Sequence, residues 1–188
     1  MRRRAARGRY DAETVHAVLD EGIVCHLAVA DDEGPIVLPT GYVRIGDEVV
    51  VHGSASNRLL RLAADGRSIC LTVTLLDGLV LARSAFNHSM NYRSVVAFGR
   101  ARVVEGEEKE QALAAFVEHM VPGRSVVARP PTSTELAATL VLALPLAEAS
   151  AKVRTGPPHD DEADLALDVW AGVIPLAVVA GEPVPDAS

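Results

Sequence analysis

The segment His52–Arg58 carries the kinds of side chain that bind an anion. A β-branched run, Val49–Val51, predicts a strand that ends here, and the apolar spacing after residue 57 predicts a helix. The side chains that could hold the anion are Ser54, Ser56, Asn57 and Arg58. Because the first N–H groups of a helix have no intrahelical partner, such a turn suits a phosphate. The alternative interpretation is that Ser54 or Ser56 is simply an N-cap and Arg58 a solvated helix residue.

Three further polar groups interrupt apolar sequence. Residues 84–94 form a polar cluster between two strand-like runs, and burying its members without partners would be costly. The members that could line a cavity are His88, Asn91 and Tyr92. Lys152 and Arg154 lie at strand alternation and share a face, where they could stabilise an anion. Trp170, two residues before Gly172, could form one wall of a site for a ring-shaped ligand. Each group also has an ordinary structural interpretation: residues 84–94 as a hydrophilic loop, Lys152 with Arg154 as a solvated strand end, and Trp170 as part of the core.

The familiar protein-based catalytic motifs are absent from the sequence. It contains no GxSxG, HExxH or P-loop pattern, and its six histidines show no compact metal-ligand spacing. Cys25 and His26 are adjacent in a predicted strand, so their side chains should point to opposite faces and cannot form a thiolate dyad. If the protein is an enzyme, we therefore expect the reactive atom to belong to a bound cofactor.

Composition predicts one globular domain with an aliphatic core. The chain has 188 residues, of which 49% are hydrophobic and only 4% aromatic, and its net charge of -7 argues against nucleic-acid binding. Five arginines in the first nine residues predict a flexible basic arm over residues 1–10, followed by a domain over 11–180 and a loose tail over 181–188. No secretory signal or membrane span is evident, and Cys25 and Cys70 fit reduced thiols, so we expect a cytoplasmic protein.

The pattern of elements favours an antiparallel β fold over a doubly wound one. Short apolar runs separated by turn residues alternate unevenly with helical periods. The expected strands are 23–30, 36–44, 48–52, 68–76, 79–84, 93–104, 139–152 and 169–179. The expected helices are 11–21, 56–64 and 107–120, with a short helical turn after Pro130–Pro131. We expect Pro145 to kink or bulge the strand that contains it.

Taken in order, these clusters resemble the flavin-binding split-barrel superfamily, specifically its pyridoxamine 5′-phosphate oxidase-like branch with the nitroimidazole-reductase (Nim-type) proteins. The resemblance spans almost the whole chain and is most specific in Leu38–Val43, His52–Ser54 and Asn91–Ala101. It implies a mainly β fold, a six-stranded antiparallel split barrel (a β-barrel with flanking helices) of the FMN-binding type. It also implies a homodimer with flavin, FMN or FAD, at the interface.

The resemblance assigns roles to individual residues. The turn with Ser54, Ser56, Asn57 and Arg58, called the hydroxyl turn below, is similar to the family's flavin-phosphate cradle, with Asn57 where serine is more usual. The strand segment Pro39, Thr40, Gly41 and Tyr42 is similar to the one that runs beside the flavin ring. His52 matches the position of the Nim-type active-site histidine, and Lys152 and Arg154 are expected near the flavin's pyrimidine edge. After Trp170, however, Val173–Leu176 lacks the arginine that grips substrate phosphate, which argues against true pyridoxamine phosphate oxidase activity.

Three functions remain open at this point. The first is a flavin-dependent oxidoreductase acting on a small molecule, such as a nitro-aromatic compound. The second is a non-catalytic module that stores or senses flavin or haem, in which His88 or His52 could ligate iron. The third, favoured only by the arginine-rich arm, is a regulator that contacts nucleic acid.

Overall fold

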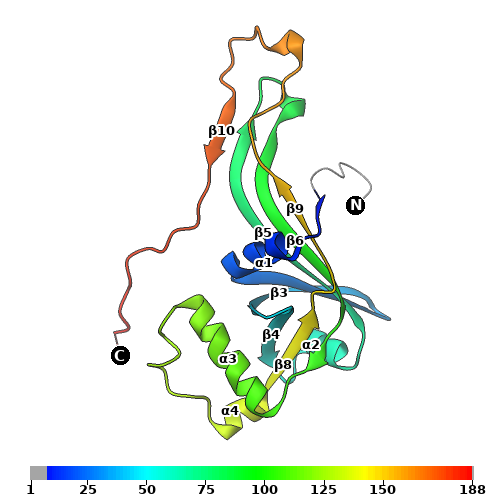
Figure 1. Cartoon of the computed structure of the whole chain (residues 1–188), viewed down its shortest axis with the longest axis vertical. Coiled ribbons are helices and arrows are strands. Elements are labelled where there is room, and N and C mark those ends of the chain that lie inside the picture. Colours follow the sequence, from blue (N-terminus) through cyan, green and yellow to red (C-terminus); the bar gives the residue numbers. More distant parts are fainter. Residues whose placement is uncertain (1–7, 188) are drawn as a thin grey trace. The chain divides into compact units, whose positions relative to one another are not determined.

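The computed structural model describes residues 8–187, which fall into two compact units. Unit 1 contains the described residues up to Leu75 together with Ser94–Val153. Unit 2 contains Leu76–Arg93 and the described residues from Arg154 onward. Strands β5 and β6 run through both units (Figure 1). The seven residues before Gly8, which include most of the predicted basic arm, lie outside the described part.

Antiparallel strands make up most of the described chain. The strands are β1 (Gly8–Arg9), β2 (Val24–Asp31), β3 (Gly34–Ile45), β4 (Glu48–Ser54), β5 (Ser68–Leu81), β6 (Ser89–Arg100), β7 (Arg102–Val103), β8 (Thr139–Pro145), β9 (Glu148–Arg154) and β10 (Gly172–Pro175). Hydrogen bonding orders them β1-β9-β6-β5-β2-β3-β4-β8-β7, and β10 pairs with the second half of β5 within unit 2. The helices are α1 (Ala12–Glu21), α2 (Arg58–Ala64), α3 (Gly106–Met120) and α4 (Ser133–Ala138).

The main core of unit 1 lies on the inner face of this sheet. Strand alternation sends Val49 and Val51 of β4 inward, where they pack with Leu27, Leu71 and Leu142. Helix α1 begins at Asp11, whose carboxylate accepts a hydrogen bond from the Thr14 N–H at 2.8 Å. It buries Val15, Val18 and Leu19 in the same core.

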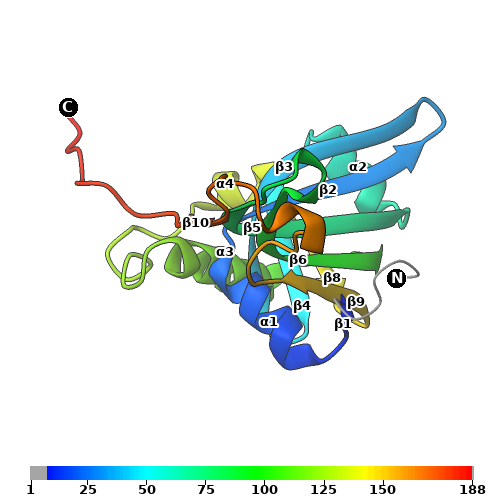
Figure 2. The same cartoon turned by 90° about the horizontal axis from the view of Figure 1, so that it is seen from above.

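Helix α3 covers the opposite, outer face of β3, β4 and β8. Buried residues of these strands form a second cluster with Ala112 and the flanking Leu113, Ala115 and Phe116 of the helix. The strand residues in this cluster are Val43, Val50, Val141 and Ala143. Figure 2 shows α3 from a second direction. The sheet of unit 1 is therefore covered on both faces in this region, and His52, between Val51 and Gly53, faces the α3 side.

The mainly β, antiparallel, barrel-type class of fold expected from the sequence is confirmed, but the strand count is not six. The described residues contain ten strands, of which β1 and β7 are only two residues long. Residues 139–152 were expected to be one strand, yet the chain turns at Leu146–Ala147, directly after Pro145, and separates β8 from β9.

The expected break at Asp77–Gly78 was also wrong, because β5 continues through it. Gly78 instead allows close approach of β10: a Cβ atom there would lie 3.0 Å from the Ile174 carbonyl oxygen. The last expected strand, 169–179, is confined to Gly172–Pro175. The division into a basic arm, a domain over 11–180 and a tail stays a prediction, although Gly8 and Arg9 pair with β9 and residues 181–187 have no regular secondary structure.

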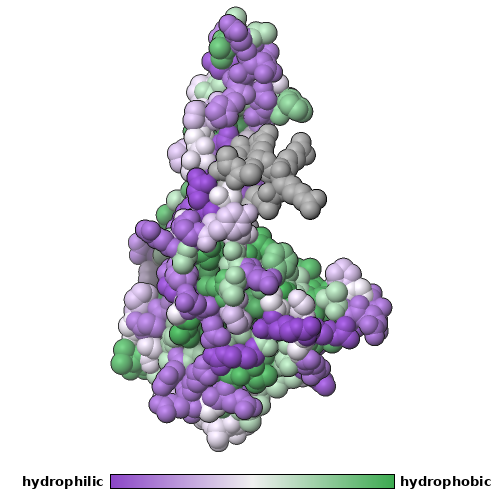
Figure 3. Space-filling view, turned by 45° about the vertical axis from the view of Figure 1, so that its right-hand side comes forward, coloured by the Kyte–Doolittle hydropathy of each residue, from purple (hydrophilic) through white to green (hydrophobic). Residues whose placement is uncertain are grey.

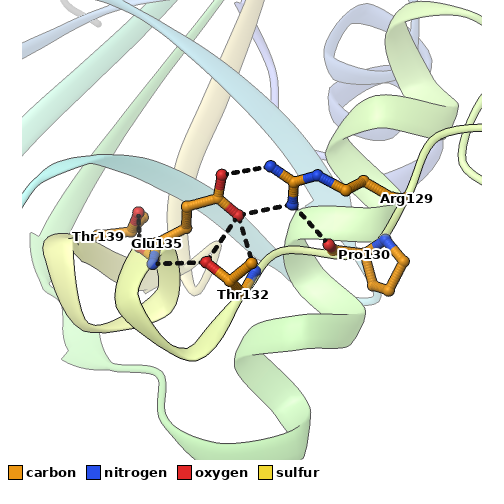
Figure 4. Close-up of polar contacts among 5 residues, drawn as sticks. All are labelled: Arg129, Pro130, Thr132, Glu135 and Thr139. Atoms are coloured by element: carbon orange, nitrogen blue, oxygen red, sulfur yellow. Dashed lines mark hydrogen bonds and ion pairs between the residues drawn. The ribbon is translucent and has the colours of Figure 1, made fainter.

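Helix α4 is fixed by a capping box and an ion pair. The Glu135 N–H donates to the Thr132 hydroxyl, and the Glu135 carboxylate accepts from the Thr132 N–H at 2.7 Å. Figure 4 shows the same carboxylate lying between Thr132 and the Arg129 guanidinium. Arg129 donates to both carboxylate oxygens, at 2.8 and 2.6 Å. One glutamate therefore ties the α3–α4 connection to the first turn of α4.

This arrangement predicts an acid-sensitive contribution to stability. Hydrogen bonding from Arg129, then from Thr132, lowers the pKa of Glu135 from 4.5 to about 2. A lowered folded-state pKa stabilises the fold above the unfolded pKa, and this stabilisation is lost as pH falls from about 4.5 towards 2. Glu135→Gln should therefore lower the free energy of unfolding at pH 7, and the difference from wild type should shrink between pH 5 and pH 3. Urea unfolding across that range measures it, with Glu110→Gln as the control; a difference independent of pH would contradict the assignment.

Candidate functional site: the His52 pocket and the hydroxyl turn

A pocket of about 830 Å³ lies in unit 1 between α3, the α3–α4 connection, α4 and the ends of β4 and β8. The apolar part of its wall comes from Leu113, Ala114, Phe116, Val117, Ala128, Pro130 and Pro131. The polar part comes from His52, Glu107, Glu110, Gln111, Ser125, Arg129, Glu135 and Thr139. A concave pocket that combines apolar walls with several polar groups is a candidate small-molecule or cofactor site.

His52 contributes a neutral imidazole to this pocket. Burial lowers the pKa of His52 below its ordinary value, so the ring is uncharged at pH 7. The ring of Phe116 packs edge-on against it, with 4.4 Å between the ring centroids and an interplanar angle of 73°. Among the described residues, no protein group hydrogen-bonds either ring nitrogen of His52. A neutral imidazole of this kind can ligate a metal or exchange a proton with a bound molecule.

The hydroxyl turn follows β4 directly, two residues beyond His52. The Ser54 and Ser56 hydroxyls lie 2.8 Å apart, both side chains are exposed, and the Ser56 N–H donates to the Ser54 hydroxyl. Asn57 is the N-cap of α2, because its side-chain oxygen accepts from the Leu60 N–H at 3.2 Å. The alternative interpretation, in which Ser54 or Ser56 is the N-cap, was wrong in the residue: Asn57 caps the helix, and the two serines are open to solvent. A Cβ atom at Gly53 would lie 2.8 Å from a terminal methyl group of Leu60, so a larger residue there would require that side chain to shift.

Arg58, the first residue of α2, is paired with the β2–β3 hairpin. Its Nη2 atom donates to Asp31 Oδ2 at 2.5 Å and to Glu33 Oε2 at 2.6 Å. These partners, Glu33 first, raise the pKa of Arg58, and hydrogen bonding from the Glu33 backbone lowers the pKa of Asp31. Within residues 8–187, Nε and Nη1 of Arg58 form no hydrogen bond. Arg58 could therefore receive an anion on those atoms, in competition with the two carboxylates.

The four residues of the expected flavin strand lie on β3 and differ in their surroundings. Tyr42 is fully buried, and its hydroxyl donates to the Leu19 carbonyl oxygen at 2.7 Å, which fixes α1 against β3. Gly41 is covered by Phe116, whereas Pro39 is exposed and Thr40 is half-buried. Only Pro39 and Thr40 therefore present side chains that a ligand on this strand could reach. Lys152 lies in β9, opposite Gly8 of β1.

The remaining predicted site residues belong to unit 2. Arg154 is buried there and donates to the Asn91 side-chain oxygen, to the Gly156 carbonyl at 3.0 Å and to the Pro157 carbonyl at 3.3 Å. Asn91 in turn donates to Gly156 at 3.2 Å, so both side chains hold the chain that follows β9. His88 and Trp170 are exposed, and Tyr92 is half-buried. Contact between these residues and a flavin stays a prediction.

Three residues that the fold brings to the His52 pocket were not among the predicted site residues. Phe116 belongs to the apolar stripe of α3 and was expected only as part of a core-facing helix. Arg129 and Glu135 meet through a local ion pair, for which the Thr132–Glu135 spacing of a capping box was the available signal.

Within residues 8–187, no helix is long and apolar enough to cross a bilayer.

Comparison with known proteins places this geometry in a family. The family model described as pyridoxamine 5′-phosphate oxidase matches residues 11–153. None of the curated proteins matches the chain. The chain is similar to the flavocytochrome Anf3 of Azotobacter vinelandii, with 45% identity, a TM-score of 0.93, and coverage of 100% of this chain and 87% of that one. It is also similar to an FAD and haem binding protein of Mycobacterium smegmatis, with 38% identity, a TM-score of 0.92, and coverage of 96% and 89%.

A more distant structure shares the fold alone. A candidate 5-nitroimidazole antibiotic resistance protein of Bacteroides thetaiotaomicron is 20% identical, with a TM-score of 0.65 and coverage of 78% of this chain and 86% of that one. The family model covers more than half of the chain, and two structures exceed 30% identity over nearly all of it. The chain therefore belongs to the pyridoxamine 5′-phosphate oxidase family, as its sequence motifs indicated.

Proposed function

We propose that this protein is an oxidoreductase that binds both a flavin, FAD, and a haem, and that the haem occupies the His52 pocket. The observation that carries the proposal is the neutral imidazole of His52, which has no hydrogen-bond partner among the described residues and faces a pocket whose wall includes the apolar side chains of α3. The two relatives at 45% and 38% identity, a flavocytochrome and an FAD and haem binding protein, support it. This proposal joins the flavin-dependent activity and the haem-binding alternative.

The pocket residues fit a haem. Haem needs an axial ligand and apolar contacts for the macrocycle. His52 would supply the ligand, and Leu113, Phe116, Val117 and Pro130 would supply the apolar contacts, in a pocket of about 830 Å³ that Glu107, Glu110 and Glu135 also line. Haem held by one histidine supplies one-electron chemistry, which a flavin can connect to a two-electron donor. The nitro-aromatic substrate class rests on the position of His52 alone, because the relative with that description is only 20% identical.

The flavin proposal rests on the hydroxyl turn. Ser54 and Ser56 are exposed, and Arg58 has guanidinium atoms that no described residue occupies, so together they can hold a flavin phosphate. In unit 2, the exposed indole of Trp170 offers a face for an aromatic ring.

The proposal includes a homodimer, which the apolar side chains at the surface support. Figure 3 shows hydrophobic residues among hydrophilic ones on one face. A small-molecule substrate and a cytoplasmic location remain part of the proposal.

Native mass spectrometry of the purified chain tests cofactor content and dimerisation together. We expect Arg58→Ala to weaken FAD binding by about ten-fold or more, because a charge-assisted contact contributes roughly 1.5–3 kcal/mol. Asp31→Asn with Glu33→Gln should strengthen binding, since the phosphate then has no carboxylate competitors for Arg58. Arg61→Ala, on the same helix, is the matched control. Unchanged FAD affinity in Arg58→Ala would place the phosphate elsewhere.

Haem reconstitution tests the role of His52. The wild-type chain should develop a Soret band that survives dialysis, and His52→Ala should lose it or lower haem affinity by at least ten-fold, because the axial ligand is removed. His88→Ala tests the other candidate ligand, and the exposed His26 of β2 serves as a control in His26→Ala. A Soret band that persists unchanged in His52→Ala but disappears in His88→Ala would assign the iron to unit 2. No Soret band in the wild type would refute the haem proposal.

A further inference from the structure

Gly41 and His52 occupy facing positions on neighbouring strands. Tyr42 of β3 is opposite Val51 of β4 in the antiparallel register, so the next residue outward on each strand is Gly41 and His52. Both residues are on the α3 side of the sheet, since their neighbours Tyr42 and Val51 are in the inner core. Because glycine has no side chain, the place beside the His52 ring on this face is left empty by β3.

Phe116 of α3 fills this place. A Cβ atom added to Gly41 would lie 2.7 Å from both Cε2 and Cζ of Phe116, so the ring is in direct contact with the glycine backbone. The same ring meets His52 edge-on, with 4.4 Å between the centroids. Any larger residue at position 41 would force the ring or the strand to move, because contacts that short do not occur in relaxed structures.

The rest of α3 holds Phe116 in this position. One turn further along, His119 Nε2 lies 2.7 Å from the Gly22 carbonyl oxygen, which ties the end of the helix to the chain before β2. One turn earlier, Ala112 is buried against Val43, Val50 and Val141. Phe116 is thus fixed by its own helix on one side and by the β3 backbone on the other.

We propose that Phe116 is the positioning residue for His52, and that Gly41 exists to admit its ring. This inference rests on the proposed function only in giving His52 the role of ligand-binding residue. The edge-to-face contact restrains rotation of the imidazole, and the phenyl ring closes the wall of the pocket next to it. A ligand entering the pocket therefore meets an imidazole already held in one orientation, which lowers the entropic cost of binding.

A double-mutant cycle tests the contact between Gly41 and Phe116. Gly41→Ala should destabilise the full chain in urea, because the new methyl group collides with the ring. In the Phe116→Ala background the methyl group has room, so Gly41→Ala should cost at least ten-fold less in the unfolding equilibrium constant. An equal penalty in both backgrounds would overturn the assigned contact. Gly46→Ala, at an open turn, provides a control whose penalty should not depend on residue 116.

A second experiment measures the orientation of the His52 side chain, which a change in overall stability does not by itself alter. In the full chain with selectively labelled histidine and no haem added, side-chain coupling constants should report one His52 rotamer in the wild type, in Phe116→Tyr and in the control Phe98→Leu, and a mixture of rotamers in Phe116→Leu. Unlike ring-proton shifts, these couplings do not change merely because the ring current of Phe116 is lost. In the haem-loaded chain, Phe116→Leu should weaken haem binding by about ten-fold while Phe116→Tyr retains it. A single His52 rotamer in Phe116→Leu would overturn the proposal. Failure of the wild type to bind haem would refute the proposed function, and the His52 couplings and the mutant cycle would still decide the role of Phe116.

Discussion

The packing of α3 across the outer face of β3, β4 and β8 is the interaction on which the His52 pocket depends. Small and branched residues make the close approach possible: Ala112 packs against Val43, Val50, Val141 and Ala143. Burying this surface stabilises the helix on the sheet through the hydrophobic effect. The same approach brings one wall of the pocket to His52 and leaves the α3–α4 connection to form the opposite wall.

Strand alternation divides the residues of β4 between stability and chemistry. Val49 and Val51 enter the main core, whereas His52 lies at the edge of the outer cluster, half-buried and without a hydrogen-bonding partner among the described residues. The main core packs against the inner face of β4 and makes the strand rigid. On the neighbouring strand β3, the Tyr42 hydroxyl donates to the Leu19 carbonyl oxygen of α1. Rigid strands on one side and a helix on the other hold the imidazole with a lowered pKa in a fixed environment.

Ion pairs define the boundaries of both candidate sites. Glu135 fixes Arg129 at the rim of the His52 pocket, and Asp31 with Glu33 fixes Arg58 beside the hydroxyl turn. The Arg129–Glu135 pair is exposed and contributes modestly to stability, whereas the Asp31 side chain is largely covered. At Arg58 the two carboxylates hold the guanidinium beside the hydroxyl turn and would compete with an incoming phosphate for it.

The sequence by itself determined the family, the antiparallel β class, and most of the strands and helices, and it predicted roles for His52 and the turn after it. These follow from local patterns: alternation, capping residues and motif spacing are properties of neighbouring residues. The continuation of β5 through Asp77–Gly78, and the commitment of Tyr42, Asn91 and Arg154 to protein contacts, could not be predicted in this way. Only the tertiary structure decided that Phe116 replaces the side chain that Gly41 lacks and that the α3–α4 connection encloses a pocket. Both depend on contacts between residues far apart in the chain, which local sequence patterns do not encode.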